Sequence, residues 1–170
     1  TTNTENVTIG TAGLNVSGPV EIYGGTTTLD GDVVSTAGGA AVLVNGTTAI
    51  VLNGGNLTTN AGNVTLDGNV TLATDASVTS GSGAGDVLFQ GAVDGNHSLG
   101  VTAGTGNVTF AAAVGGQTPV GEVDVSGGTL SLASTTTVGA QTFTGTAILP
   151  AASHVTAGGA VTLKGAVTLN

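Results

Sequence analysis

The chain has no cysteine, methionine or tryptophan, and Lys164 is its only cation. With one cation against ten carboxylates and a formal net charge of −9, it lacks the clustered Lys and Arg that neutralise phosphates. We therefore expect no nucleic-acid partner. No apolar run approaches the roughly 18 residues of a membrane span, so we expect no such span. The lack of cysteine fits a large exported bacterial protein, and it also fits many cytosolic ones.

Aromatic residues and good helix formers are also scarce, which leaves a composition typical of an all-β chain. Valine and threonine pack well on a pleated surface, and the 31 glycines and the asparagines favour turns. The mean hydropathy of +0.41 and the regular spacing of apolar residues argue against disorder. The chain has four aromatic residues: Tyr23, Phe89, Phe110 and Phe143.

Three ladders of apolar residues share a period of about 22 residues. The first ladder consists of pairs with one residue between their members, namely Val20/Ile22, Val42/Val44, Val64/Leu66, Val87/Phe89, Val108/Phe110 and Leu130/Leu132. The second ladder is Ile9, Leu29, Val51, Leu72, Val93 and Val114. The third and looser ladder is Val16, Val34, Leu57, Val78, Leu99 and Val123.

The repeat predicts a right-handed parallel β-helix, a solenoid of 7–8 coils that spans residues 1–170 as a single segment. Residues at i and i+2 project to the same face of a strand, and short turn signals such as Asn45-Gly46 and Asp67-Gly68 separate the strands. Each unit thus gives three short strands, which bury their apolar face only when units stack at about 4.8 Å. A β-sandwich, with its strand spacing of about 8 to 12 residues, would not explain the period.

A second self-match indicates a phase break near 133–142. Residues 66–79 align without gaps with residues 143–156, at an offset of 77 residues or three and a half periods. Because that offset is not a whole number of coils, we expect a short or distorted coil between Leu132 and Phe143.

The stretch from Gly91 to Gly116, with Gly139 to Phe143, resembles the β-strand repeats of filamentous-haemagglutinin-like large exoproteins and bacterial adhesins. The resemblance covers most of the chain from about Asn63 onward. It implies an extracellular, non-enzymatic shaft on a secreted bacterial surface protein. The motif Asn-Pro-Asn-Gly, typical of the secretion domain of two-partner exoproteins, is absent.

The carboxylates do not form a recognisable catalytic or metal-binding motif. Glu122 and Asp124 flank Val123 and should share an outward face, while Asp30 and Asp32 share a turn. A glycosidase needs two carboxylates across a cleft, and calcium needs about six or more gathered oxygens. We therefore interpret the carboxylates as solvated turn residues and expect no catalytic, cofactor or metal site. Four more aspartates are scattered along the chain: Asp67, Asp75, Asp86 and Asp94.

The two histidines are interpreted as surface residues. His97 lies in a predicted turn and His154 stands beside Val155, an expected inward residue, and neither has a partner at ligand spacing. The Asn-x-Ser/Thr sequence recurs because strands begin with Asn-Val-Thr, and glycosylation depends on the host. It occurs at Asn6, Asn15, Asn45, Asn56, Asn63, Asn69, Asn96 and Asn107.

The sequence is thus expected to be a structural shaft, either an adhesin stalk or a subunit of an extracellular fibre. Its partners would be flanking β-helix coils or other copies stacked end to end, and host or cell-surface glycans. One alternative is a polysaccharide-binding or polysaccharide-degrading β-helix protein, although the chain has no Arg to face a uronic acid. A second alternative is an ice-binding solenoid. The outward residues of the first ladder disfavour it because they do not repeat threonine: Glu21, Leu43, Thr65, Leu88, Thr109 and Ser131.

Overall fold

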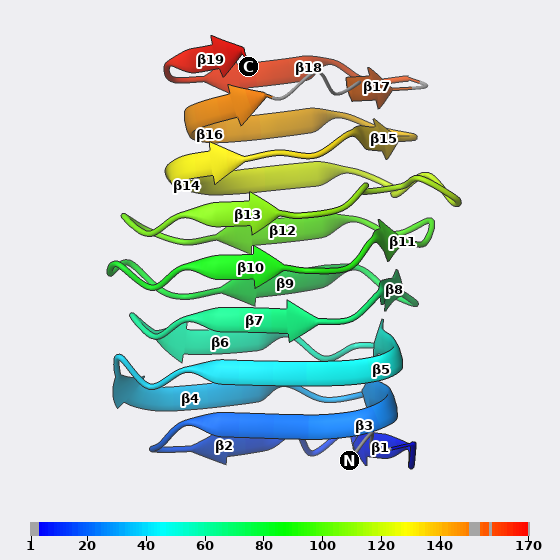
Figure 1. The fold of residues 1–170 in the computed structure, drawn as a ribbon, viewed down its shortest axis with the longest axis vertical. Helices are drawn as coiled ribbons and strands as arrows, with labels where there is room; N and C mark the ends of the chain where they lie inside the picture. Colours follow the sequence, from blue (N-terminus) through cyan, green and yellow to red (C-terminus); the bar gives the residue numbers. More distant parts are fainter. Residues whose placement is uncertain (1–3, 150–153, 157, 170) are drawn as a thin grey trace.

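In the computed structural model, the chain is a β-solenoid of about seven turns with about 22 residues in each turn. The structure describes residues 4–149, 154–156 and 158–169, and these contain no helix. All strand pairs are parallel, and the two ends of the chain lie at opposite ends of a rod (Figure 1). As the chain rises from its N-terminal end in Figure 1, the nearer strands run to the right and the more distant ones to the left, which makes the coil right-handed. The predicted fold is confirmed.

The strands form three faces, which we call A, B and C, and after β1 on face C the chain visits them repeatedly in that order. Four long strands turn a corner and belong to two faces: β3, β5, β14 and β16. Face A consists of β2 (Leu14–Val16), β4 (Val33–Gly38), β6 (Leu57–Asn60), β9 (Ala76–Thr79), β12 (Leu99–Thr102), the first parts of β14 (Val123–Ser131) and β16 (Gln141–Leu149), and β18 (Val161–Lys164).

Face B contains the first ladder, and face C is the most irregular. Face B consists of the first parts of β3 (Val20–Leu29) and β5 (Val42–Leu52), β7 (Val64–Asp67), β10 (Val87–Phe89), β13 (Val108–Phe110), the last parts of β14 and β16, and β19 (Val167–Leu169). Face C consists of β1 (Val7–Ile9), the last parts of β3 and β5, β8 (Val70–Leu72), β11 (Val93–Asp94), the single bridge residue Val114, β15 (Thr135–Thr137) and β17 (His154–Thr156).

The first ladder has the predicted register. Val20, Val42, Val64, Val87, Val108 and Leu130 are paired in succession from coil to coil, and all are buried. The rings of Phe89 and Phe110 stack with centroids 4.8 Å apart and an interplanar angle of 15°. The register of face B could be predicted because the two inward apolar residues of each pair are separated by one residue, which points outward.

The second and third ladders lie on faces C and A, but the strand pairing departs from both. Val93 pairs with Val70 rather than Leu72, and Leu99 pairs with Ala76 rather than Val78, so each ladder slips by two residues. Each ladder also contains a residue that points outward. Val51 and Val34 are only half-buried, whereas Ile50, Leu52 and Val33 are completely buried. Successive side chains of a strand point to opposite faces, so Val51 and Val34 point outward. The prediction failed there because Ile50-Val51-Leu52 and Val33-Val34 are apolar at every position and carry no alternation.

The chain continues to visit faces A, B and C in the same order through residues 133–142, where the phase break was expected. Leu130 pairs with Ala147 and Val125 pairs with Phe143, so the coil here has steps of 17 and 18 residues rather than about 22. The self-match relates strands on different faces, because Leu66 lies on face B and Phe143 on face A. The offset of 77 residues is therefore a repeat of single strands, not of whole coils.

Polar side chains that point into the core donate hydrogen bonds to backbone carbonyl oxygens. The hydroxyl groups of Thr27, Ser35 and Thr59 are completely or almost completely buried and donate to the carbonyls of Asn45, Gly18 and Gly62 respectively. A buried hydroxyl without such a partner would be costly, and these bonds offset that cost while they fix the turns.

Glycine columns line two corners of the solenoid. At the corner between faces A and B, a Cβ placed on each glycine would lie within 3.0 Å of a backbone carbonyl oxygen one coil below, that of Ala40 for the first glycine and that of the preceding glycine for the others. This column is Gly62, Gly85, Gly106, Gly127, Gly145 and Gly165. A shorter column occupies the corner between faces B and C: Gly46, Gly68 and Gly91. Its last two members meet the carbonyl oxygen of the preceding glycine, whereas a Cβ on Gly46 would meet that of Ala49 in the same coil. Coils approach closely enough to pair their strands only because these positions have no side chain.

The core prediction is tested by truncation of inward and outward residues on face B. Phe89→Ala and Phe110→Ala should each lower the free energy of unfolding by about 3–5 kcal/mol, because each leaves a cavity in the stacked column. Thr65→Ala and Thr109→Ala, which change outward side chains of the neighbouring strands, should cost less than about 1 kcal/mol. Equal effects in urea titrations of the four variants would contradict the register.

The corner prediction uses two glycines of neighbouring segments. Gly106→Ala should destabilise the protein by about 1–3 kcal/mol or more, because its Cβ would meet the carbonyl oxygen of Gly85. Gly100 in β12 is the control, since a Cβ there would have its nearest neighbour 4.0 Å away. Gly100→Ala should leave stability unchanged or raise it by up to about 1 kcal/mol, because it restricts the unfolded chain. Thermal unfolding that ranked the two variants in the opposite order would exclude the steric explanation.

Candidate functional site

Side chains that directly precede a strand clamp neighbouring coils together. In each clamp, a side-chain oxygen accepts a hydrogen bond from the backbone N–H of the corresponding residue one coil later. Asp86, for example, accepts from the N–H of Asn107 at 2.7 Å, and Asn63 accepts from the N–H of Asp86 at 2.9 Å. The same contact is made by Asn6, Asp32, Asn56, Asn69, Asp75 and Ser98. The view of these carboxylates as merely solvated turn residues was therefore incomplete.

Three further carboxylates also accept hydrogen bonds across coils. Asp30 and Asp67 accept from the side-chain amides of Asn53 and Asn45, each at 2.8 Å. Asp94 accepts from the backbone N–H groups of two loop residues, as described below. These bonds hold the acidic residues at separate corners. No group of three or more His, Asp or Glu side chains that could hold a metal ion occurs in the part of the chain that the structure describes.

Glu122 and Asp124 lie where the sequence placed them. Both are exposed on face A, on either side of Val123, which is buried. The backbone N–H of Glu122 donates to the hydroxyl oxygen of Ser98 at 3.3 Å. The two carboxylates therefore lie on an open sheet surface. Glycoside hydrolysis requires two carboxylates that face each other across a cleft, and these two do not.

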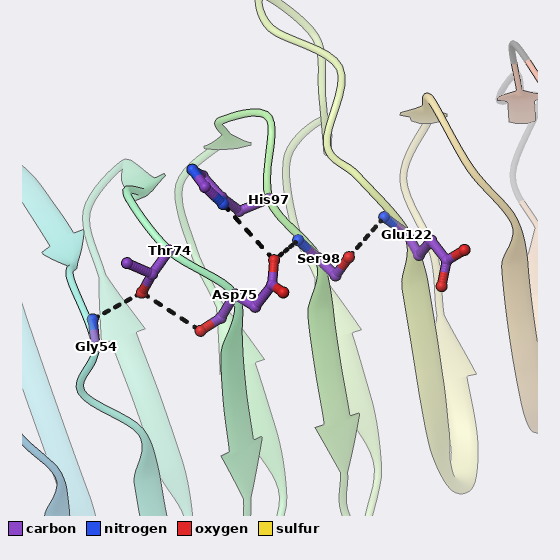
Figure 2. A network of polar contacts seen from close by, with 6 residues as sticks. All are labelled: Gly54, Thr74, Asp75, His97, Ser98 and Glu122. Carbon is purple, nitrogen blue, oxygen red and sulfur yellow. Dashed lines mark hydrogen bonds and ion pairs between the residues drawn. The ribbon is translucent and has the colours of Figure 1, made fainter.

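An aspartate, a histidine and a serine lie close together on consecutive coils (Figure 2). Asp75 Oδ1 accepts from the N–H of Ser98 at 2.8 Å and lies 3.6 Å from His97 Nδ1. In Figure 2 the ring of His97 lies beside Asp75, while the hydroxyl of Ser98 points toward Glu122. A catalytic triad needs the serine oxygen within reach of the histidine, and here the serine oxygen accepts the N–H of Glu122 instead. The cluster is a structural link across coils.

His97 lies at the surface with 43% of its side chain exposed, but it has a carboxylate neighbour that the sequence did not indicate, Asp75 of the preceding coil. The expectation that His154 is a surface residue is wrong. His154 pairs with Thr135, which is buried, and so occupies the inward register that we had given to Val155. The rings of His154 and Phe143 pack edge to face with their centroids 5.7 Å apart. Burial of the imidazole lowers its pKa below the usual value.

Face A has a column of hydroxyl groups that was not predicted from the sequence, because only the outward residues of face B had been compared for repeated threonines. The column has one member on each of five successive coils: Thr58, Thr79, Thr102, Ser126 and Thr144. Lys164 continues the same register on the next coil. The neighbouring register is interrupted by Gly100 and Asp124, so the array is one residue wide there.

Two hollows in the surface of the solenoid lie beside clamp residues. The larger hollow is a groove of about 360 Å³ on face C, and the smaller one, of about 240 Å³, lies beside Asn63 and Asp86 on face B. The larger groove is lined by Ala49, Asn69 and Asp94, among others, from four successive coils. Because its lining combines residues more than 60 positions apart, sequence reasoning could not find it.

Comparisons with protein-family models, with curated proteins and with solved structures found no match to this chain. In the described residues no helix is long and apolar enough to cross a membrane.

The clamp assignment predicts a difference between two substitutions of Asp86. Asp86→Asn keeps the Oδ1 acceptor for the N–H of Asn107 and should leave stability within about 0.5 kcal/mol of the parent. Asp86→Ala removes the acceptor and should cost about 0.5–2 kcal/mol, as loss of a capping side chain does. The check is the free energy of unfolding in denaturant at pH 7. Equal loss in both variants would mean that charge, not the hydrogen bond, matters at this corner.

Proposed function

We propose that this chain is a structural shaft of an extracellular surface protein, an adhesin stalk or a fibre subunit, and not an enzyme. The observation that carries the proposal is that the last described coil presents its inward residues to solvent. Val161, Leu163 and Val167 are 42%, 37% and 44% exposed, and Leu169 is 78% exposed. Their counterparts one coil below, Phe143 and Ala147, are buried.

An exposed end of this kind is completed by more of the same fold. A strand edge has unpaired N–H and C=O groups, and here it borders an apolar core cross-section, so covering it with another coil satisfies both. At the other end of the rod, Val7, Ile9, Leu14 and Val16 are only partly buried. We therefore propose that β-helix coils stack on these ends, supplied by flanking chain or by another copy.

The placement of the polar groups supports a non-enzymatic role. The carboxylates hold separate coils together and are spread along the rod, whereas catalysis by paired carboxylates needs them at one place. The extracellular location is proposed from the resemblance to exoprotein repeats and from the acidic, cation-poor composition. The hydroxyl column on face A is the one feature that favours ice binding. Because the column is only one residue wide, we prefer the assignment as a structural shaft.

The stacking proposal predicts end-to-end association of the purified chain. Sedimentation should show assemblies that grow with concentration, and electron microscopy should show rods one solenoid wide. Leu163→Lys and Val167→Lys should abolish growth, because each places a charge on the apolar cross-section. The matched controls Thr162→Lys and Thr168→Lys, which change outward positions of the same strands, should assemble as the parent does.

A monodisperse monomer whose β18 and β19 amides are strongly protected from hydrogen exchange would refute the proposal, because its end would then need no cover. If the chain turns over a polysaccharide and this activity is lost on neutralising Asp30, Asp32, Glu122 or Asp124, the protein is an enzyme and the shaft proposal is wrong.

A further inference from the structure

The walls of the larger groove on face C combine apolar and polar residues. The apolar residues include Ala49 and Ala92, from the corners that precede the face C strands. The polar residues include Asn69 and Thr71 at β8, Asp94 in β11, and Gln117 from the loop one coil later. At about 360 Å³ its size lies in the lower part of the range of about 300–1,000 Å³ found for ligand sites.

Hydrogen bonds within the protein hold these walls in place before any ligand arrives. Asp94 Oδ1 accepts from the backbone N–H groups of Gln117 at 2.8 Å and Thr118 at 3.0 Å, which fixes the loop against face C. Asn69 Oδ1 accepts from the N–H of Ala92 at 3.1 Å. A groove whose walls are already ordered loses less conformational entropy on binding.

The same bonds leave the other polar atoms of the groove available. Within the described residues, Asp94 Oδ2, Asn69 Nδ2, the Thr71 hydroxyl and the Gln117 side-chain amide have no protein hydrogen-bond partner. They offer both donors and acceptors in the same groove as the apolar side chains of Ala49 and Ala92. A ligand that matches them must itself have donors and acceptors on its rim and an apolar face.

The charge of the groove restricts the class of ligand further. The groove contains one carboxylate and no cation, on a chain with a formal net charge of −9, so the field repels anions. A neutral sugar has hydroxyl groups on its rim and C–H groups on its faces, which fits both features. We propose that this groove binds a sugar residue of a neutral oligosaccharide, with Asp94 Oδ2 and the Gln117 amide hydrogen-bonded to its hydroxyls.

This site is independent of the proposed shaft function. A groove that binds no sugar leaves the stacking of coils unaffected, and a chain that does not assemble can still bind through the groove. The two failures are therefore distinguishable by separate measurements.

The test is a titration of the purified chain with soluble neutral oligosaccharides that end in glucose, galactose, mannose or N-acetylglucosamine, followed by NMR. Tetragalacturonate serves as the anionic probe. At least one neutral oligosaccharide should bind saturably and perturb the amides of residues 69–71, 92–95 and 117–118, and tetragalacturonate should not bind. Asp94→Asn keeps the Oδ1 acceptor for the loop and should weaken binding about tenfold or more, because it removes a charged acceptor. Gln117→Ala should weaken it about fivefold.

Thr102→Val on face A is the control and should bind as the parent does, since Thr102 lies on another face of the solenoid. Thermal unfolding of all three variants verifies that they are folded. The proposal is overturned if no neutral oligosaccharide in the series binds saturably, if tetragalacturonate binds more tightly, or if Asp94→Asn and Gln117→Ala bind as well as the parent.

Discussion

Glycine at the corners sets the distance at which successive coils stack. In both columns, at every glycine except Gly46, the space that a Cβ would occupy is filled by the backbone carbonyl of the coil below. Strands on three faces pair simultaneously only if the corners between them also allow an approach of about 4.8 Å. The apolar ladders, the aromatic stack and the clamps all depend on that approach. The abundance of glycine, which in another chain would suggest flexibility, here supports close packing.

The polar residues of the corners complement the glycines. A side-chain oxygen before a strand satisfies a backbone N–H of the next coil, so the clamps fix the register where the turn leaves backbone groups without a strand partner. Three aspartates, Asp32, Asp75 and Asp86, are used in this way, and three more acidic residues accept other hydrogen bonds across coils. What remains for interaction with other molecules is the outward surface of the strands, the exposed coil at each end and the hollows beside the clamps.

The sequence predicted the solenoid, its period and the register of face B, because an outward residue separates the inward pairs there. It misassigned Val34 and Val51, which lie within runs of apolar residues that could face either way. It did not bring Asp75 to His97 or Asp94 to Gln117, because such contacts depend on coil lengths that vary around the period. Asparagine or aspartate directly before an apolar pair, as at Asn63 and Asp86, was the available signal for the clamps. The sequence analysis attributed the asparagines to the repeat and interpreted the aspartates as solvated turn residues.

The stacking of strands along the rod also determines how the molecule would respond to tension. Its backbone hydrogen bonds run along the long axis, so a force that separates the two ends pulls on these bonds directly, and an end strand, paired on one side only, would detach first. Each released turn of about 22 residues would replace a rise of about 4.8 Å by roughly 70–80 Å of extended chain. A rod of this kind lengthens in steps under load, and each step dissipates mechanical work before the covalent chain is stretched.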